Sequence, residues 1–209
     1  MKSQMNFSFK DKKRIFAVVM AVILMGLSLS FLIRLDFGTD PCSSMLLGIS
    51  DTLGITFGNI QVLLNALLFI IVILCDRSKI GWGTLVNMLL LGYCTDFFIW
   101  VIDNVLPLNA FNNLGIRIAV LIPALTLFIF SAAVYMAVDL GLVPYDATVY
   151  IIASKFEKIP FRVIRMCWDI AACIIGFLLG STIGIVTVAM AFALGPVISW
   201  VTVRVNKIL

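Results

Sequence analysis

Long apolar runs, broken only by short polar segments, are the feature of this sequence that most narrows its fold. The first run, residues 15–33, is nineteen residues long and carries no charge. A helix that crosses a bilayer needs about 20 predominantly apolar residues. Soluble domains are about 25% charged, whereas charged residues make up 12% of this chain and hydrophobic residues 62%. The sequence therefore predicts an all-α polytopic membrane protein, and its 209 residues allow about six transmembrane helices with short connections.

The chain also repeats itself at an offset of 103 residues. The segments LDFGTDPC (35–42) and VDLGLVPY (138–145) both read Asp-x-Gly-x-x-Pro, and in the same register Gly81 and Thr84 match Gly184 and Thr187. Leucine matches would be frequent by chance in so apolar a chain, but matches of Asp, Gly, Pro and Thr would not. We therefore expect a single membrane domain made of two repeat halves, residues 1–106 and 107–209.

Each half is predicted to contain three full-length helices and one short segment. The full helices are expected at 14–35, 57–75 and 81–102 in the first half, and at 117–138, 161–180 and 184–204 in the second. The short segments, 41–53 and 144–155, hold about a dozen residues, too few to cross ~30 Å of hydrocarbon as ordinary helices. We expect them to be re-entrant or half-membrane helices.

The basic residues indicate the orientation of the halves. With three full spans per half, the N-terminus, the loops 76–79 and 154–162, and the C-terminus share one side, which holds most Lys and Arg residues. The positive-inside rule makes that side cytoplasmic. Three spans per half then give an inverted repeat. If the short segments also spanned, eight helices and parallel repeats would result, and Arg34, Arg77 and Lys79 would lie outside; we favour the inverted arrangement of six.

The repeated motif predicts how each short helix begins. Pro41 and Pro144 suit the first helical position, where a missing N–H leaves nothing unpaired, and Asp40 is a candidate N-cap. Gly38 and Gly141 would permit a sharp turn out of the preceding span. In secondary transporters, half-helix N-termini with free N–H groups often bind anionic groups. The alternative is a pair of tight turns that only reverse the chain.

A pair of charges inside a predicted span is the strongest candidate for a binding site. Arg165 and Asp169 are four residues apart and share a helix face, and the repeat, after one inserted residue, aligns them with Gln61 and Asn65. Ionisable residues inside a membrane are costly and usually face a cavity or a partner. These four would form a central polar site for a small zwitterionic or carboxylate-bearing solute. The alternative is a structural ion pair, with Arg165 snorkelling to the surface.

Further polar residues of the repeat could line the same cavity. Asp146 lies on the first turn of the second short helix, where capping is an equally good explanation, and Thr84 and Thr187 occupy matched positions. The complete set of predicted substrate-binding residues is Arg165, Asp169, Asp146, Pro144, Gln61, Asn65, Asp40, Thr84 and Thr187.

Several classes of function are not supported by the sequence. The chain has no histidine, which removes imidazole metal ligands and Ser-His-Asp chemistry, and it shows no glycine-rich phosphate loop. We expect no enzyme, no metal and no cofactor. The basic residues lie beside membrane spans, so we expect no nucleic-acid partner.

Three stretches resemble the YczE/YitT-type bacterial membrane proteins: LGLVPYDA (140–147), FRVIRMCWD (161–169) and GSTIGIVTVAMAFALGPVISW (180–200). The resemblance covers nearly the whole chain. This chain departs from the family pattern at Val186, which replaces a glycine, and at Tyr145, which follows the proline. The resemblance implies a bacterial cytoplasmic membrane and a presumed transport function, with Pro144, Asp146, Arg165, Asp169, Thr187, Gly195 and Pro196 in place.

The leading hypothesis is a secondary transporter for a small polar solute, with a midplane site between inverted halves and with both termini cytoplasmic. The main alternative is the substrate-binding membrane subunit of an energy-coupling-factor type vitamin importer, suggested by the Ala17-x-x-x-Ala21 spacing. A membrane scaffold without transport activity is a third. Gly176, Gly180 and Gly184 are spaced four apart, which predicts close helix packing. We favour packing within the monomer over a homo-oligomer.

Overall fold

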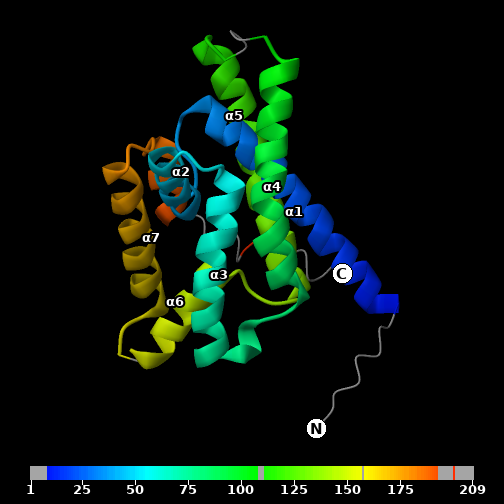
Figure 1. The fold of residues 1–209 in the computed structure, drawn as a ribbon, viewed down its shortest axis with the longest axis vertical. Helices are drawn as coiled ribbons and strands as arrows, with labels where there is room; N and C mark the ends of the chain where they lie inside the picture. The colour runs from blue at the N-terminus through cyan, green and yellow to red at the C-terminus, as the bar shows by residue number, and fades with distance from the viewer. Residues whose placement is uncertain (1–8, 108–110, 157, 193–199, 201–209) are drawn as a thin grey trace.

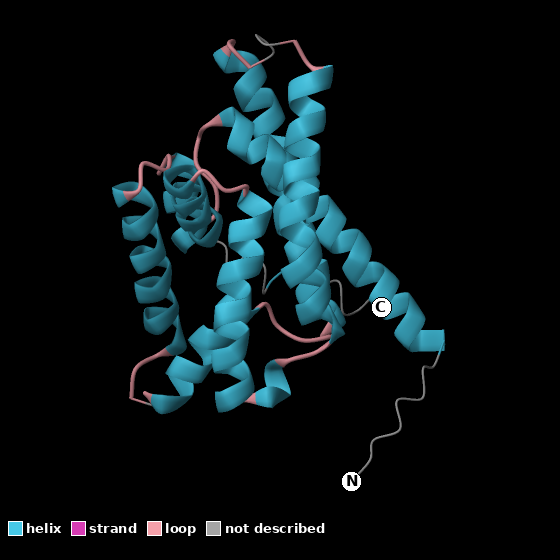
Figure 2. Cartoon of the chain, in the orientation of Figure 1, coloured by secondary structure: helices cyan, strands magenta, loops and turns pink. Residues whose placement is uncertain are grey.

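The computed structural model describes residues 9–107, 111–156, 158–192 and 200. Within these ranges the chain is built from helices and connecting loops, without a strand (Figure 2). The all-helical prediction is therefore confirmed for the described residues.

The helix bounds follow the predicted segments closely. In the first half they are α1 (Phe9–Leu35), α2 (Pro41–Leu53), α3 (Phe57–Cys75), the short 3-10 helix η1 (Arg77–Lys79) and α4 (Trp82–Val105). In the second they are α5 (Leu114–Val138), α6 (Pro144–Lys155) and α7 (Phe161–Leu178). A further helix begins at residue 185 and is described to residue 192; the rest of the predicted 184–204 helix, apart from residue 200, lies outside the described residues.

Four of these helices are long and apolar enough to cross a membrane: α1, α3, α4 and α5. Helix α7 has 18 residues, about 27 Å at 1.5 Å per residue, but it carries Arg162, Arg165 and Asp169. The short helices α2 and α6 have 13 and 12 residues, or about 20 and 18 Å, which is well below the ~30 Å of a hydrocarbon core. The prediction of two short helices is thus confirmed in their bounds.

The two halves interlock rather than lie side by side. Helix α1 packs against α5 and α4, α2 packs against α7, and α3 packs against α4 and α6. Figure 1 shows α2 above α6, with both short helices drawn beside α3 and α7. The largest core cluster accordingly takes residues from both halves, including Val22, Leu29, Leu46, Phe128 and Ala133.

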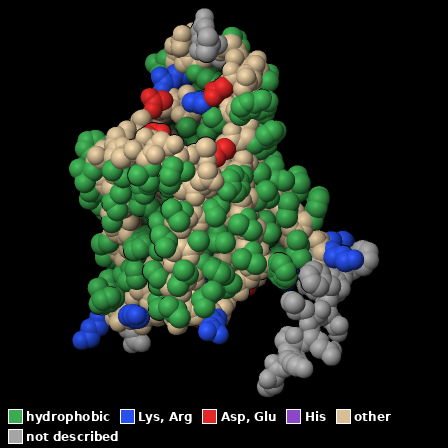
Figure 3. Space-filling view, viewed as in Figure 1, with side chains coloured by type: hydrophobic (Ala, Val, Ile, Leu, Met, Phe, Trp, Pro, Cys, Tyr) green, Lys and Arg blue, Asp and Glu red, His purple; other side chains and the backbone are tan. Residues whose placement is uncertain are grey.

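A broad apolar band covers the visible face of the molecule (Figure 3). Many large apolar side chains of the described residues are exposed; Leu74 and Ile185 each expose 76% of their surface. Lys and Arg gather along the lower edge of this view, whereas residues of both signs lie near its upper end. An ion pair of this mixed kind joins Arg34, near the end of α1, to Asp103 of α4. A band of this kind matches a protein surrounded by lipid, with its basic side at one face.

Both Asp-x-Gly-x-x-Pro segments form turns of the same backbone shape. Asp36 and Asp139 lie in the left-handed region, with φ of 56° and 53°, and Gly38 and Gly141 follow with φ of 91° and 105°. Side chains rarely adopt such φ values, and glycine adopts them without steric cost. The turns therefore need glycine where the sequence repeats it.

The first turn rests against the second half of the chain. The N–H of Val186 donates to the carbonyl of Phe37 at 3.1 Å, at the start of the helix that begins at residue 185. Gly38 lies so close to Gly184 and Thr187 that a Cβ at position 38 would stand 2.7 Å from the Gly184 nitrogen. The first turn and the start of this helix can thus pack closely because Gly38 and Gly184 have no side chains.

The second turn rests in the same way against the first half. The N–H of Gly83, at the start of α4, donates to the carbonyl of Leu140 at 2.7 Å. A Cβ at Gly141 would stand 2.8 Å from the Cα of Gly81 and 2.5 Å from the Oγ1 of Thr84. Each turn therefore occupies a seat built by the repeat-matched residues of the other half.

Candidate functional site

A cavity of about 410 Å³ lies between the two halves of the chain. Its lining includes residues of every α-helix from α1 to α7, and Ala191 and Phe192 of the helix that begins at residue 185. Pockets that bind small molecules typically measure about 300–1,000 Å³ and combine apolar walls with a few placed polar groups. The size and position of this cavity suit a small solute.

The N-terminal ends of both short helices face this cavity. Pro41 and Pro144 occupy the first helical turns, as predicted, and Asp40 caps α2 by accepting a hydrogen bond from the Ser43 N–H at 3.1 Å. Asp146 lies on the first turn of α6, where the helix dipole favours a negative charge. Asp40 and Asp146 both line the cavity, so a carboxylate lies at or near the N-terminal end of each short helix.

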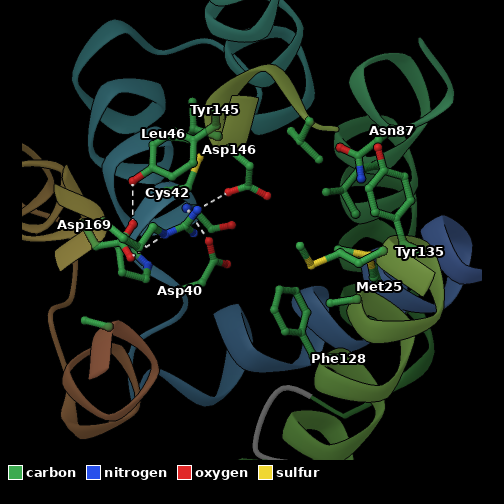
Figure 4. A pocket seen from close by; sticks show the side chains of 18 of the residues that line it. Met25, Asp40, Cys42, Leu46, Asn87, Phe128, Tyr135, Tyr145, Asp146 and Asp169 are labelled. Atoms are coloured by element: carbon green, nitrogen blue, oxygen red, sulfur yellow. Dashed lines mark hydrogen bonds and ion pairs between the residues drawn. The ribbon is translucent and has the colours of Figure 1, made fainter. Parts of the chain in front are cut away.

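Arg165 of α7 lies between two carboxylates. Its Nε donates to Asp169 Oδ2 at 3.0 Å, and its NH1 group donates to Asp146 Oδ1 at 2.5 Å. The Asp169 pair joins residues four apart on one helix, whereas the Asp146 pair joins α7 to α6. The guanidinium of Arg165 is thereby held in place with both of its charge-assisted contacts inside the protein (Figure 4).

Tyr145 completes this charged cluster. Its hydroxyl donates to Asp169 Oδ1 at 3.0 Å, its ring lies 5.6 Å from the Arg165 guanidinium, and the Trp168 ring packs against it at 5.7 Å. Sequence reasoning missed this residue as part of the site. The signal was present, because Tyr145 stands where the chain departs from the family pattern after the proline, but one tyrosine among many aromatic residues gave no reason to select it.

Three buried amide side chains supply further polar groups. Gln61 and Asn65 of α3 and Asn87 of α4 line the cavity and expose only 3%, 1% and 0% of their surface. Gln61 Oε1, Asn65 Oδ1 and both polar atoms of Asn87 have no hydrogen-bond partner within the described residues. Buried polar atoms are normally paired, and leaving one unpaired costs about 1–3 kcal/mol. These atoms are therefore candidates for contact with a bound solute.

An apolar wall faces the charged cluster across the cavity. Figure 4 shows Met25, Phe128 and Tyr135 on this side, together with Asn87, while Asp40, Asp146, Asp169 and Tyr145 stand on the other. The Tyr135 hydroxyl donates to the carbonyl of Gly141 at 3.2 Å, so its ring is oriented by the second turn. No pattern in the sequence separates these residues from the many other apolar positions.

One end of the cavity reaches the basic side of the molecule. Tyr150, in the middle of α6, and Phe161 and Arg162, at the start of α7, are exposed and also line the cavity. The loop between α6 and α7 contains Lys158, and Lys155 ends α6. The cavity lining therefore includes exposed residues on that side.

The structure places the predicted site residues in two groups. Arg165, Asp169, Asp146, Gln61, Asn65 and Asp40 all line the same cavity. Pro144 does not, although its neighbours Val143 and Tyr145 do. Thr84 and Thr187 do not line it either; both are buried beside the turns, where Thr84 Oγ1 accepts from the Gly81 N–H at 3.1 Å. Gly195 and Pro196 lie outside the described residues. No cluster of three or more metal-ligating residues occurs in the described ranges.

The chain belongs to the family of unknown function DUF6198, whose pattern it matches over residues 12–203. An uncharacterised protein of Haemophilus influenzae is 24% identical over 190 residues, which cover 90% of this chain and 83% of that protein. The uncharacterised protein YyaS of Bacillus subtilis is 26% identical over 137 residues, covering 66% of this chain and 67% of YyaS. No solved structure matches. The chain thus has bacterial relatives in an uncharacterised family, in agreement with that part of the resemblance.

Proposed function

We propose that this chain is a secondary transporter of a small polar solute, which it carries through a midplane site between two inverted halves. The observation that carries the proposal is the meeting of both short helices at one cavity, each with its N-terminal end towards the solute space. Discontinuous helices of this kind form the substrate sites of many transporters. From the sequence we expected this solute to be zwitterionic or carboxylate-bearing.

The reciprocal seating of the turns supports the inverted repeat. The repeat matches Gly38 with Gly141 and Gly81 with Gly184, and each turn rests on the matched residue of the opposite half. Such an exchange of equivalent contacts is expected when two similar halves are related by a pseudo-two-fold axis. The proposed topology has three spans in each half: α1, α3 and α4 in residues 1–106, and α5, α7 and the helix that begins at residue 185 in residues 107–209.

We further propose that the protein lies in the bacterial cytoplasmic membrane, with both termini in the cytoplasm. The gathering of Lys and Arg along one edge of the molecule supports this orientation through the positive-inside rule (Figure 3). The resemblance to the YczE/YitT-type proteins belongs to the same proposal. We propose no enzymatic activity and no nucleic-acid partner; the lipid bilayer and the solute are the partners, and a homo-oligomer is left open.

The vitamin-importer alternative receives less support from the arrangement of α1. Its suggested docking spacing, Ala17 and Ala21, would have to present a free face to a partner helix. Ala21 exposes only 3% of its surface and belongs to the main core cluster. Ala17 packs against the same cluster. A scaffold function would leave the cavity and its unpaired amides without a purpose.

Access to the cavity from both sides of the membrane is the test that separates a transporter from a scaffold. Cys42 lines the cavity, and Cys75 is exposed at the end of α3, beside the basic loop. Two variants are needed: one retains only Cys42 and the other only Cys75, with the remaining cysteines replaced by serine. Each is labelled with a membrane-impermeant maleimide in right-side-out and in inside-out vesicles, and a permeant maleimide reports the intrinsic reactivity of each thiol.

A transporter should expose Cys42 from both faces, because its site alternates between them, whereas Cys75 should react from the basic face alone. Reaction of Cys42 from one face only, while the permeant reagent labels it fully, would contradict alternating access. The Cys75 variant also reports the orientation of the basic side in the membrane.

A further inference from the structure

We infer that the solute is recognised through an ammonium group, and that the preferred ligand is a small amine with an apolar body. This inference rests on the proposed transport site, and it names the class of solute that the site would accept.

Among the charged groups around the cavity, a carboxylate is free to bind a solute, whereas no well-buried cation is. Three aspartates line it, and Arg165 already pairs with two of them, Asp146 and Asp169. Arg162 lies at the exposed start of α7, at the edge of the cavity. Asp40 uses one oxygen to cap α2, and its Oδ1 is buried without a partner in the described residues. An incoming carboxylate would therefore meet an unpaired carboxylate, whereas an ammonium would neutralise it.

The helix ends offer little to an anion for the same reason. A free helix N-terminus attracts negative charge through its unpaired N–H groups and its dipole. Here the end of α2 is capped by Asp40 and the first turn of α6 carries Asp146. The expectation of a carboxylate-bearing solute rested on Arg165 as the cation of the site, and Arg165 is already paired with Asp146 and Asp169.

The unpaired buried amide atoms point to a ligand that donates hydrogen bonds. Four residues that line the cavity each hold a buried oxygen without a partner in the described residues, against one unpaired donor, the Asn87 Nδ2; they are Asp40, Gln61, Asn65 and Asn87. The orientation of Asn65 is fixed, because its Nδ2 donates to the carbonyl of Gln61 at 3.0 Å and leaves Oδ1 as the free atom. An ammonium group supplies three donors and no acceptor, so it complements a set of acceptors of this kind.

The rest of the cavity favours an organic cation over a metal ion. Aromatic rings of Phe128, Tyr135 and Tyr150 and the thioether of Met25 line it, and cations are attracted to aromatic faces. Calcium takes 6–8 oxygen ligands and magnesium demands an octahedral set, and the described residues hold no group of three candidate ligands that could bind a metal ion. An alkyl body against the apolar wall with its ammonium near Asp40 satisfies both sides of the cavity.

Three probes of equal chain length test the inference: butylammonium, 4-aminobutyrate and butyrate. Each is titrated into the purified full-length protein, and binding is measured by calorimetry together with the shift in thermal unfolding. Butylammonium should bind tightest, 4-aminobutyrate more weakly, and butyrate least. Tightest binding of butyrate or 4-aminobutyrate, equal stabilisation by Na⁺ alone, or no binding of any probe by monodisperse protein would each overturn the inference.

Asp40→Asn is the informative variant, since asparagine caps a helix about as well as aspartate and should leave α2 intact. It should weaken butylammonium binding about ten- to a hundredfold, because a hydrogen bond to a charged group contributes about 1.5–3 kcal/mol. Asp51→Asn, on the exposed part of α2, changes the net charge equally and should leave binding unchanged. Unchanged binding in Asp40→Asn would contradict the assignment.

The outcome is separable from that of the transport proposal. Amine binding with one-sided Cys42 labelling would retain the binding site and reject transport. Two-sided labelling without amine preference would retain transport and reject the ammonium inference.

Discussion

Replacing Gly141 with alanine should displace the second turn from its contact with the start of α4. Two costs combine at this position. A side chain at φ of 105° is strained, and its Cβ would stand 2.8 Å from the Cα of Gly81. The strain costs about 1–3 kcal/mol, and overpacking against a backbone that cannot yield costs about 1–3 kcal/mol more. We therefore expect a loss of about 2–6 kcal/mol.

Gly180→Ala provides the matched control. Gly180 has φ of 84°, close to those of Gly38 and Gly141, but no atom lies within 4 Å of the position a Cβ would take. Its substitution should cost the strain alone, about 1–3 kcal/mol. The difference between Gly141→Ala and Gly180→Ala therefore isolates the contact of the turn with the opposite half.

Thermal unfolding of the purified variants, followed by size-exclusion chromatography, measures this difference. At about 2–4 °C per kcal/mol for a chain of this size, Gly141→Ala should unfold roughly 2–12 °C below Gly180→Ala. Gly38→Ala should behave like Gly141→Ala, because its contacts are equivalent. Equal midpoints for Gly180→Ala and the two turn variants would refute the reasoning, since the seats would then contribute nothing.

Three further predictions concern other parts of the chain. Arg165→Ala should cost about 3–5 kcal/mol, because it strands two carboxylates, and converting both partner aspartates to asparagine in the same variant should recover most of the loss in thermal unfolding. Gly176→Leu should cost about 1–3 kcal/mol or more, since a Cβ there stands 2.9 Å from the carbonyl oxygen of Ser44, whereas Ile175→Leu on the exposed face should be near neutral in the same assay. In the loop after α3, hydrogen bonds from Ser78 hold the pKa of Asp76 below its ordinary value. The stabilisation from these bonds is present above the pKa of Asp76 in the unfolded chain and is lost as the pH falls through its lower pKa in the folded protein. Ser78→Ala should therefore raise the pKa of Asp76 in an NMR titration.

The short helices were predictable because local chemistry fixes both of their ends. Proline in the first turn and glycine in the preceding turn mark where α2 and α6 begin, and a dozen residues later the next apolar run requires a new helix. The pair formed by Arg165 and Asp169 was predictable for a similar reason, since four residues separate them on one helix.

Contacts between helices could not be read from the sequence in the same way. The salt bridge from Arg165 to Asp146 joins α7 to α6, and no spacing along the chain indicates it. The repeat matches Thr84 with Thr187, and both were expected to line the cavity, but they lie beside the turns instead. A matched position establishes that two residues are equivalent, yet it does not reveal which neighbour they share.

The seating of the first turn also has a consequence for the synthesis of the chain. Phe37 and Gly38 leave the ribosome well before the residues that support them, Gly184 to Thr187. During translation the carbonyl of Phe37 in the first turn therefore stays unpaired until the helix that begins at residue 185 has been made. A chain that stops short of residue 184 would thus lose support at its beginning, and quality control should detect the defect in the first half rather than at the truncated end.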